Sequence, residues 1–219
     1  MIRGAIFDAD GTLLDSMGMW RTAEVRYLHS IGKESKPGLS EALFAMTLHE
    51  GAAFLQREYA LPFSPEEVAE GINRVIRDFY RTEVRAKPGA KAFLQKLRRD
   101  GVRITVATNT DRAEITEGLR STGLLPLIEN IFTCGELNTG KRLSSLIYDT
   151  ARDWMGTELR DTWVFEDAVH AARTAHDAGY YVAGMADPYS DQTDLKKLCH
   201  CCLTDFTDYD GFYAVAAGI

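Results

Sequence analysis

Short apolar runs alternate with longer amphipathic stretches along much of this chain. Each apolar run has fewer than eight residues and is bounded by glycine or acidic residues, a pattern typical of buried strands. The runs expected to form strands are 2–7, 102–107, 163–165, 180–185 and, as a weak edge strand, 201–203. Apolar residues at helical spacing predict helices over 90–99, 112–122, 144–155 and 168–178. Because strand and helix alternate from residue 86 onward, we expect a parallel sheet with helices on both faces.

The stretch 17–85 interrupts this alternation and contains only helical patterns. Within it, Ser64 followed by Glu67 forms a capping box that opens a helix. A helical insertion therefore follows the first strand. The sequence predicts an α/β fold, in which a Rossmann-like parallel sheet forms the core and a small helical domain is inserted into it. The predicted domains are 1–16 with 86–219 for the core, and 17–85 for the insertion.

Composition places the chain among ordinary folded proteins. Its 219 residues are 45% hydrophobic and 26% charged, with a formal net charge of −7. This negative balance argues against a protein that binds nucleic acid electrostatically. Apolar runs stay below the ~18 residues of a membrane helix, and the first one ends at Asp8, before a secretory signal could form. We expect a cytoplasmic monomer that binds neither nucleic acid nor a membrane.

Three of the four cysteines crowd into the tetrapeptide 199–202, a spacing that does not suggest a disulfide framework. Zinc binding there is disfavoured, because adjacent residues on a strand point to opposite faces and no second Cys/His pair completes four ligands. We expect reduced, buried thiols on a late edge strand.

The strongest chemical signal is the string 7–15, which places Asp8 and Asp10 just past a buried strand. Side chains two residues apart in an extended segment share one side, so both carboxylates can face one reacting centre. Gly11 then allows a sharp turn. A solvated Asp-Gly turn would explain part of this string but is a poor explanation of the whole of it.

Three weaker signals follow at the ends of later strands or in a loop. Thr108 and Asn109 precede a helix, where a hydroxyl and free backbone N–H groups suit a phosphate oxygen, although a plain N-cap would look the same. Lys141 lies in a loop, where most lysines are solvated. Glu166 and Asp167 offer hard oxygen ligands that suit Mg²⁺, or form an ordinary acidic helix start.

Taken in order, these four motifs resemble those of the haloacid dehalogenase-like superfamily, over nearly the whole chain. The helical insertion between the first and second motifs is similar to the family's α-helical cap, as in phosphoglycolate phosphatases and beta-phosphoglucomutases. The resemblance implies that Asp8 is a nucleophile that attacks phosphorus, and that Asp10 is the general acid and base. Asp10 also points to phosphoryl transfer, because the true dehalogenases of the family lack this second Asp.

The same resemblance implies a Mg²⁺ cofactor. One Asp8 oxygen, the Asp10 backbone carbonyl and Asp167 would hold the ion, with Glu166 either a further ligand or a neighbour of the ligands. The transferring phosphoryl group would be bound by Thr108, by the backbone N–H of Asn109 and by Lys141.

Two segments depart from the family's pattern. Relatives often carry Pro-x-Pro after the lysine, whereas Arg142 to Ser145 stand here. Many relatives place Ser after the second acid and Gly or Asp at the position of His170, whereas Ala168 and His170 stand here. These departures lie directly after Lys141 and directly after the acids that would surround the metal.

Three hypotheses for function remain open. The first is a Mg²⁺-dependent phosphatase acting on a small phosphorylated metabolite. The second is a phosphomutase of the beta-phosphoglucomutase type, and the third is a non-catalytic protein that binds a phosphate ligand. The intact set of acids and the lysine argues against the third. Candidates for setting specificity in the cap, each with an alternative packing role, are Trp20, Arg21, His49, Arg77 and Tyr80.

Overall fold

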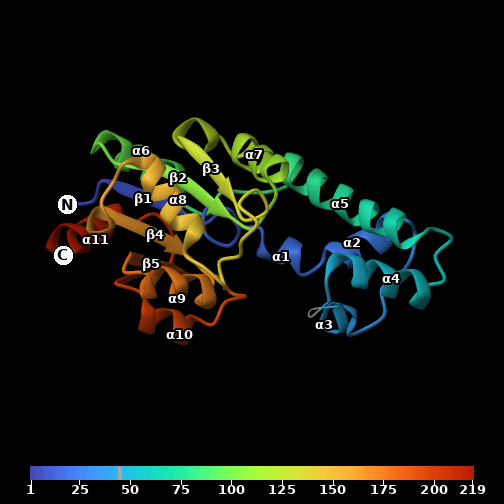
Figure 1. Ribbon diagram of the computed structural model, residues 1–219. Coiled ribbons are helices and arrows are strands. Elements are labelled where there is room, and N and C mark those ends of the chain that lie inside the picture. Colours follow the sequence, from blue (N-terminus) through green and yellow to red (C-terminus); the bar gives the residue numbers. More distant parts are fainter. Residues whose placement is uncertain (44–45) are drawn as a thin grey trace. The chain divides into compact units, whose positions relative to one another are not determined.

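The computed structural model describes residues 1–43 and 46–219. The chain divides into two compact units, Met1–Ser16 with Val84–Ile219, and Met17–Glu83. In the first unit a sheet lies between helices, and the described part of the second is helical (Figure 1). Within the described ranges, no helix is both long and apolar enough to cross a bilayer.

All strands in the described part of the chain belong to one parallel sheet in the first unit, in the order β3-β2-β1-β4-β5-β6. Its strands are β1 (Gly4–Phe7), β2 (Arg103–Thr108), β3 (Asn130–Thr133), β4 (Thr162–Glu166), β5 (Tyr181–Met185) and β6 (Cys201–Leu203). The helices of this unit are α6 (Ala90–Arg99), α7 (Arg112–Ser121), α8 (Leu146–Met155), α9 (Val169–Asp177), α10 (Gln192–Leu198) and α11 (Tyr209–Gly218), with short 3₁₀ turns η1 (Leu125–Leu127) and η2 (Leu159–Asp161).

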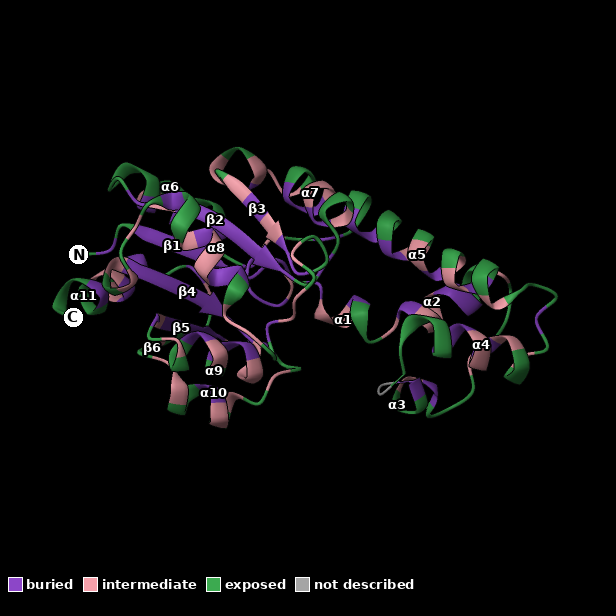
Figure 2. Cartoon of the chain, viewed as in Figure 1, coloured by how far each residue is buried: buried purple, intermediate pink, exposed green. Residues whose placement is uncertain are grey.

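Helices cover both faces of the sheet, as the alternation of strands and helices predicts. Side chains alternate between the faces along each strand. Ile6 and Val164 belong to a buried cluster with apolar residues of α8, α9 and α10. On the opposite face, the rings of Phe7 and Phe165 stack at 4.1 Å, and Phe165 lies 5.1 Å from Phe212 of α11. The central strands are consequently buried along their length, and the exposed surface lies on the outer sides of the helices (Figure 2).

Three elements of the core are missing from the sequence prediction: β3, α10 and α11. β3 is an edge strand of four residues with only two buried positions, so its apolar run is too short to stand out. α10 is short and buries only Leu195. Apart from Asp210 in its first turn, α11 consists of apolar and small residues, so it lacks the continuous polar face that signals a surface helix.

The second unit contains the helices that the interrupted pattern predicts. They are α1 (Met17–Trp20), α2 (Ala23–Ser30), α3 (Leu39–Leu43), α4 (Leu48–Glu58) and α5 (Pro65–Thr82). The capping box at the start of α5 is present: the Ser64 hydroxyl accepts from the Glu67 N–H, and the Glu67 carboxylate accepts from the Ser64 N–H. Gly71 of α5 lies against the Tyr27 ring of α2, where a Cβ would approach ring carbon to 2.2 Å.

The two connections between the units are tied together on the core side. The Asp15 N–H donates to the Arg85 carbonyl at 2.9 Å, and the Lys87 N–H donates to the Leu13 carbonyl at 2.8 Å. These bonds fasten the returning chain to the first loop, and the core unit includes Val84 and the residues that follow it.

A tight approach at Gly89 generates a stability prediction. Gly89 has φ of 77°, and an added Cβ would lie 2.6 Å from the Phe206 carbonyl carbon and oxygen. Gly101 has a similar φ of 79° with no atom within 4 Å of such a Cβ. We expect Gly101→Ala to lower the free energy of unfolding by about 1–2 kcal/mol, the cost of the left-handed backbone. Gly89→Ala should cost clearly more in urea unfolding, and equal losses would contradict this account.

Candidate active site

The strand order places a topological switch point at the carboxyl ends of β1 and β4, the position at which open α/β sheets have their ligand-binding crevice. From β1 the chain moves outward through β2 and β3, then returns to place β4 on the other side of β1. In open α/β sheets ligands bind where the direction of winding reverses in this way. Asp8 follows β1, and its N–H donates to the Phe165 carbonyl of β4 at 2.9 Å. The first predicted motif therefore lies at the point where the topology predicts a ligand.

The loop after β1 is a compact turn that holds the second carboxylate. Gly11 has φ of 83°, which a residue with a Cβ adopts only at a cost. One Asp10 oxygen accepts from the Ser16 hydroxyl at 2.5 Å, and the other accepts from the Thr110 hydroxyl at 2.6 Å. Thr110 comes from the loop after β2, so these bonds link two strand ends and fix the orientation of the Asp10 carboxylate.

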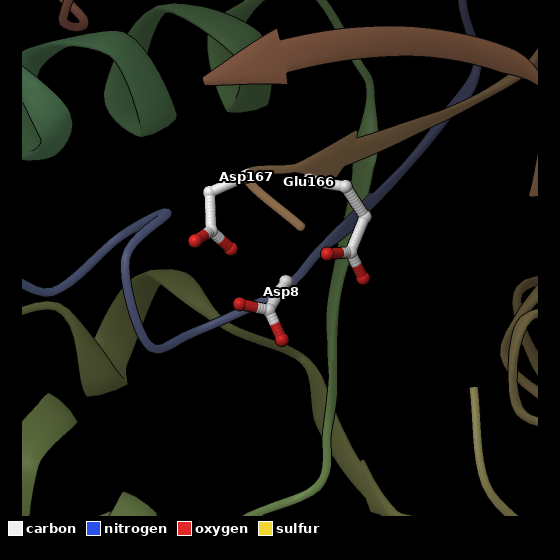
Figure 3. Close-up of side chains that lie close together, drawn as sticks. All are labelled: Asp8, Glu166 and Asp167. Atoms are coloured by element: carbon white, nitrogen blue, oxygen red, sulfur yellow. The ribbon is translucent and has the colours of Figure 1, made fainter. Parts of the chain in front are cut away.

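Three buried carboxylates meet in the crevice. Asp8, Glu166 and Asp167 each offer an oxygen within 4.8 Å of the others. Figure 3 shows these side chains turned toward one another from the ends of β1 and β4. Burial raises the pKa of Asp8 well above its ordinary value, with the nearby acids adding to the effect and Lys141 opposing it. Carboxylates packed this closely out of water repel one another strongly.

Lys141 is the cation within this cluster. Its ammonium is buried and donates to Asp8 Oδ1 and, at 2.7 Å, to Glu166 Oε1. Burial alone would lower the pKa of Lys141, but contact with the two carboxylates raises it above its ordinary value. The lysine is therefore a permanent positive charge against Asp8, in spite of the unusual sequence that follows it.

Tyr148 of α8 is a member of this network that the sequence analysis did not identify. Its buried hydroxyl donates to Glu166 Oε1 at 2.8 Å, the oxygen that also accepts from Lys141. The Lys141 ammonium lies 5.8 Å from the centre of the Tyr148 ring. Tyr148 thus supports the lysine directly and through Glu166. Its helical spacing predicts only a core residue, so the local sequence holds no signal for this role.

Asp167 has hydroxyl partners instead of a cation. The Ser190 hydroxyl donates to its Oδ2 at 3.1 Å, and Thr12 Oγ1 lies 3.4 Å from its Oδ1. Burial and the neighbouring Glu166 raise the pKa of Asp167 to about 7. Thr12 lies inside the first motif, so the local sequence does contain a signal for its hydroxyl. Ser190 is 23 residues from Asp167, and only the fold brings it there.

The residues of the crevice fit a divalent cation. When all three carboxylates are ionised, the single ammonium leaves two negative charges uncompensated in a buried site. Oxygen donors of this kind are the ligands that Mg²⁺ prefers. The charge balance and the donor chemistry therefore agree with the magnesium site expected from sequence.

The second predicted motif continues the same edge. Phe7 pairs with Val106 in the sheet, so Asp8 and Thr108 leave neighbouring strand ends. The buried Thr108 hydroxyl accepts from the Thr110 N–H at 3.1 Å, an arrangement that leaves the hydroxyl hydrogen available to donate. Asn109 is the next residue, exposed and just ahead of α7.

The cysteine-rich segment lies away from this crevice, on the edge strand β6 and just before it. We expect buried thiols there, and this is wrong: Cys199 and Cys201 are half-buried and Cys202 is exposed. β6 is an edge strand of three residues in which only Leu203 is buried, so this segment offers the thiols little cover. Among the described residues, the acidic cluster placed to hold a metal ion contains none of these cysteines.

Two candidates for specificity in the second unit turn out to pack against each other. The Trp20 indole N–H donates to the Tyr80 hydroxyl at 3.0 Å, and Tyr80 is fully buried. Arg77 forms an exposed ion pair with Glu70. The burial of Tyr80 favours its packing role over contact with a substrate.

Known proteins share both the sequence pattern and the fold. Residues 2–179 match the haloacid dehalogenase-like hydrolase family. The chain therefore belongs to the haloacid dehalogenase-like hydrolases and is an enzyme of that class, as the four motifs suggest.

The individual proteins that the chain resembles are distant from it in sequence. The chain is 27% identical over 200 residues to the probable pseudouridine-5'-phosphatase of Drosophila melanogaster, covering 89% of this chain and 85% of that one. It is 22% identical over 178 residues to the phosphorylated carbohydrates phosphatase of Thermotoga maritima, covering 81% and 82%. The crystal structure of a putative beta-phosphoglucomutase from Thermotoga maritima shares the fold, with a TM-score of 0.87 and 20% identity over 98% of this chain and 100% of that one.

The Tyr148–Glu166 bond predicts an asymmetric effect of removing two tyrosine hydroxyls. Tyr148→Phe leaves a buried carboxylate with one donor fewer and should cost about 1–3 kcal/mol of unfolding free energy. In Tyr180→Phe, the matched control, the lost partner is Asp149, whose side chain is 35% exposed, so water can replace the hydroxyl. Urea unfolding should show the larger loss for Tyr148→Phe, and an equal or reversed order would contradict the proposed network.

Proposed function

We propose that this protein is a Mg²⁺-dependent phosphatase that hydrolyses a phosphate ester of a small metabolite through an aspartyl-phosphate. The observation that carries the proposal is the placement of Asp8 at the switch point of the sheet, with its Oδ1 held by the buried Lys141. Membership of the hydrolase family and the phosphatase names of several relatives support it.

In the first step, an Asp8 oxygen attacks phosphorus and the bond from phosphorus to the substrate's alcohol oxygen breaks. Two unit charges 4 Å apart repel by about 4 kcal/mol at an effective dielectric near 20, so an anionic nucleophile and an anionic phosphate need compensation. Lys141 supplies a fixed positive charge beside Asp8, and the Thr108 hydroxyl and the Asn109 N–H would bind phosphoryl oxygens. Asp10 donates a proton to the departing alcohol oxygen.

In the second step, water attacks phosphorus and restores Asp8. Asp10 accepts the proton of that water, and the released products are inorganic phosphate and free enzyme. The Ser16 and Thr110 hydroxyls hold the Asp10 carboxylate in one orientation for both transfers.

The metal would be held by Asp8 and Asp167, with the Asp10 backbone carbonyl and Glu166 as further donors. When bound, Mg²⁺ polarises the phosphoryl group and offsets negative charge in the transition state. Glu166 Oε1 already accepts from Lys141 and Tyr148, which supports a second task for Glu166: holding the lysine against Asp8.

The helical unit 17–83 is proposed to act as a cap that excludes water during the first step. Exclusion of water would protect the phospho-enzyme until the alcohol has left. The substrate class follows from relatives whose names describe phosphatases of a nucleoside phosphate and of phosphorylated carbohydrates. A phosphomutase would return the phosphoryl group to a sugar instead of to water, and no contact in the described residues favours that outcome.

The proposed phosphatase activity is tested by phosphate release from a panel of phosphorylated sugars, nucleotides and small acids. We expect release from one or a few compounds with Mg²⁺ and none with a chelator. Asp8→Asn should abolish release while leaving the fold intact, because the amide is a poor nucleophile. Asp210→Asn removes the same charge at an exposed position of α11 and should retain activity. Near-normal turnover by Asp8→Asn would overturn the mechanism.

The proposed role of Asp10 is tested by the lifetime of the phospho-enzyme. Asp10→Asn should slow its hydrolysis by about 10²–10⁴-fold, the usual contribution of a general base. Acid quenching after mixing with a labelled substrate should then trap more phosphoprotein than in the wild type. Unchanged decay would count against Asp10 as the base, and transfer of the label to a sugar would favour the mutase.

A further inference from the structure

A second buried ion pair lies in the core unit, outside the residues assigned to catalysis. Lys87 donates to Asp187 Oδ2 at 2.9 Å, and the two side chains are 9% and 1% exposed. The Lys87 ammonium also donates to the Ala186 carbonyl at 3.2 Å. Buried pairs of this kind rarely stabilise a fold more than apolar residues would, since both charges lose their hydration. Fold stability alone is therefore a poor explanation for the burial of Lys87 and Asp187.

Asp187 organises the loop between β5 and α10. Its Oδ1 accepts from the Tyr189 N–H at 2.9 Å. Its backbone carbonyl accepts from the Ser190 N–H at 3.2 Å and from the Gln192 side chain at 3.1 Å. Every oxygen of Asp187 thus accepts a hydrogen bond, and the same loop carries the Ser190 hydroxyl that donates to Asp167.

Lys87 fastens both segments that hydrogen-bond to Asp167. Its ammonium holds Asp187, three residues before Ser190, and its N–H donates to the Leu13 carbonyl, next to Thr12. Ser190 and Thr12 contact different oxygens of Asp167. One residue therefore joins the two loops that contact the two oxygens of this carboxylate.

We propose that Lys87 and Asp187 are positioning residues that hold the Ser190 hydroxyl on Asp167 and so preset this carboxylate for the divalent cation. Hydroxyl donors orient a carboxylate without neutralising its charge, which leaves that charge for the metal. Groups that orient a metal ligand typically contribute 10–100-fold to affinity for the ion. The inference rests on the proposed function, in which Asp167 is a metal ligand.

The test is direct titration of the metal-free protein with Mn²⁺, with free Mn²⁺ measured by electron paramagnetic resonance, so that no turnover is needed. We expect Ser190→Ala to weaken binding by about 10–100-fold, and Ser190→Thr, which retains the hydroxyl, to restore most of the affinity. Lys87→Met should weaken binding by about 10-fold. Lys96→Met, the same substitution at an exposed ion pair, is the control and should bind as the wild type does.

A double-mutant cycle separates positioning from general damage. If Lys87 acts through Ser190, adding Lys87→Met to Ser190→Ala should cause little further loss of affinity. Because Lys87→Met alone leaves a buried charge unpaired, Lys87→Met with Asp187→Asn removes both charges and retains an acceptor for the Tyr189 N–H. The double variant should fold, because no buried charge is left unpaired. Its affinity for Mn²⁺ should nevertheless be lower than that of the wild type.

Each outcome decides a different point. A wild-type protein that binds no Mn²⁺ would overturn the metal-dependent function and this inference with it. Wild-type binding that is unchanged in Ser190→Ala would overturn the positioning role alone. Equal losses from Lys87→Met in both backgrounds, or unchanged affinity in the charge-free variant, would show that the ion pair does not act through Ser190.

Discussion

The ion pair between Lys141 and Asp8 is the interaction on which the rest of the site depends. Both charges are buried, and a buried charge is tolerated only with a partner close by. The partner comes from the loop after β3, whereas Asp8 follows β1, so the pair requires the parallel sheet to be in register. Glu166 and Tyr148 complete the surroundings of the lysine. The fold thereby places a fixed cation beside a carboxylate where a phosphate would need it.

The carboxylates of the crevice differ in the partners that hold them, and this difference matches the proposed division of labour. Asp8 is held by a cation, which suits a nucleophile that must approach an anionic group. Asp10 is held by the hydroxyls of Ser16 and Thr110, which orient it without adding charge. Asp167 has hydroxyl partners as well, so its charge stays available to a metal ion. Residues of the same type thus stand in different surroundings, which suit them to the separate roles proposed for them.

Much of the core could be predicted from local patterns. The strands 4–7, 103–108 and 162–166 are fully or largely buried, so their apolar runs are unambiguous. The capping box at Ser64 is a purely local signal, and it is present in the structure. By contrast, β3 and α10 bury few side chains, and their stability comes from pairing and packing with distant segments. A sequence pattern records burial, so elements that bury little leave little to detect.

By itself, the sequence determined the type of fold, the helical insertion, and the order of Asp8, Asp10, Thr108, Lys141 and Asp167 along the strand ends. These follow from periodicity and from short motifs, which act over a few residues. The tertiary structure alone decided which side chains hold them: Tyr148 on Glu166, Ser190 on Asp167, and Lys87 on the loop that carries Ser190. Such contacts join residues that are far apart in the chain. A hydrogen bond depends on the distance between two atoms in space, and the spacing of residues along the sequence does not give that distance.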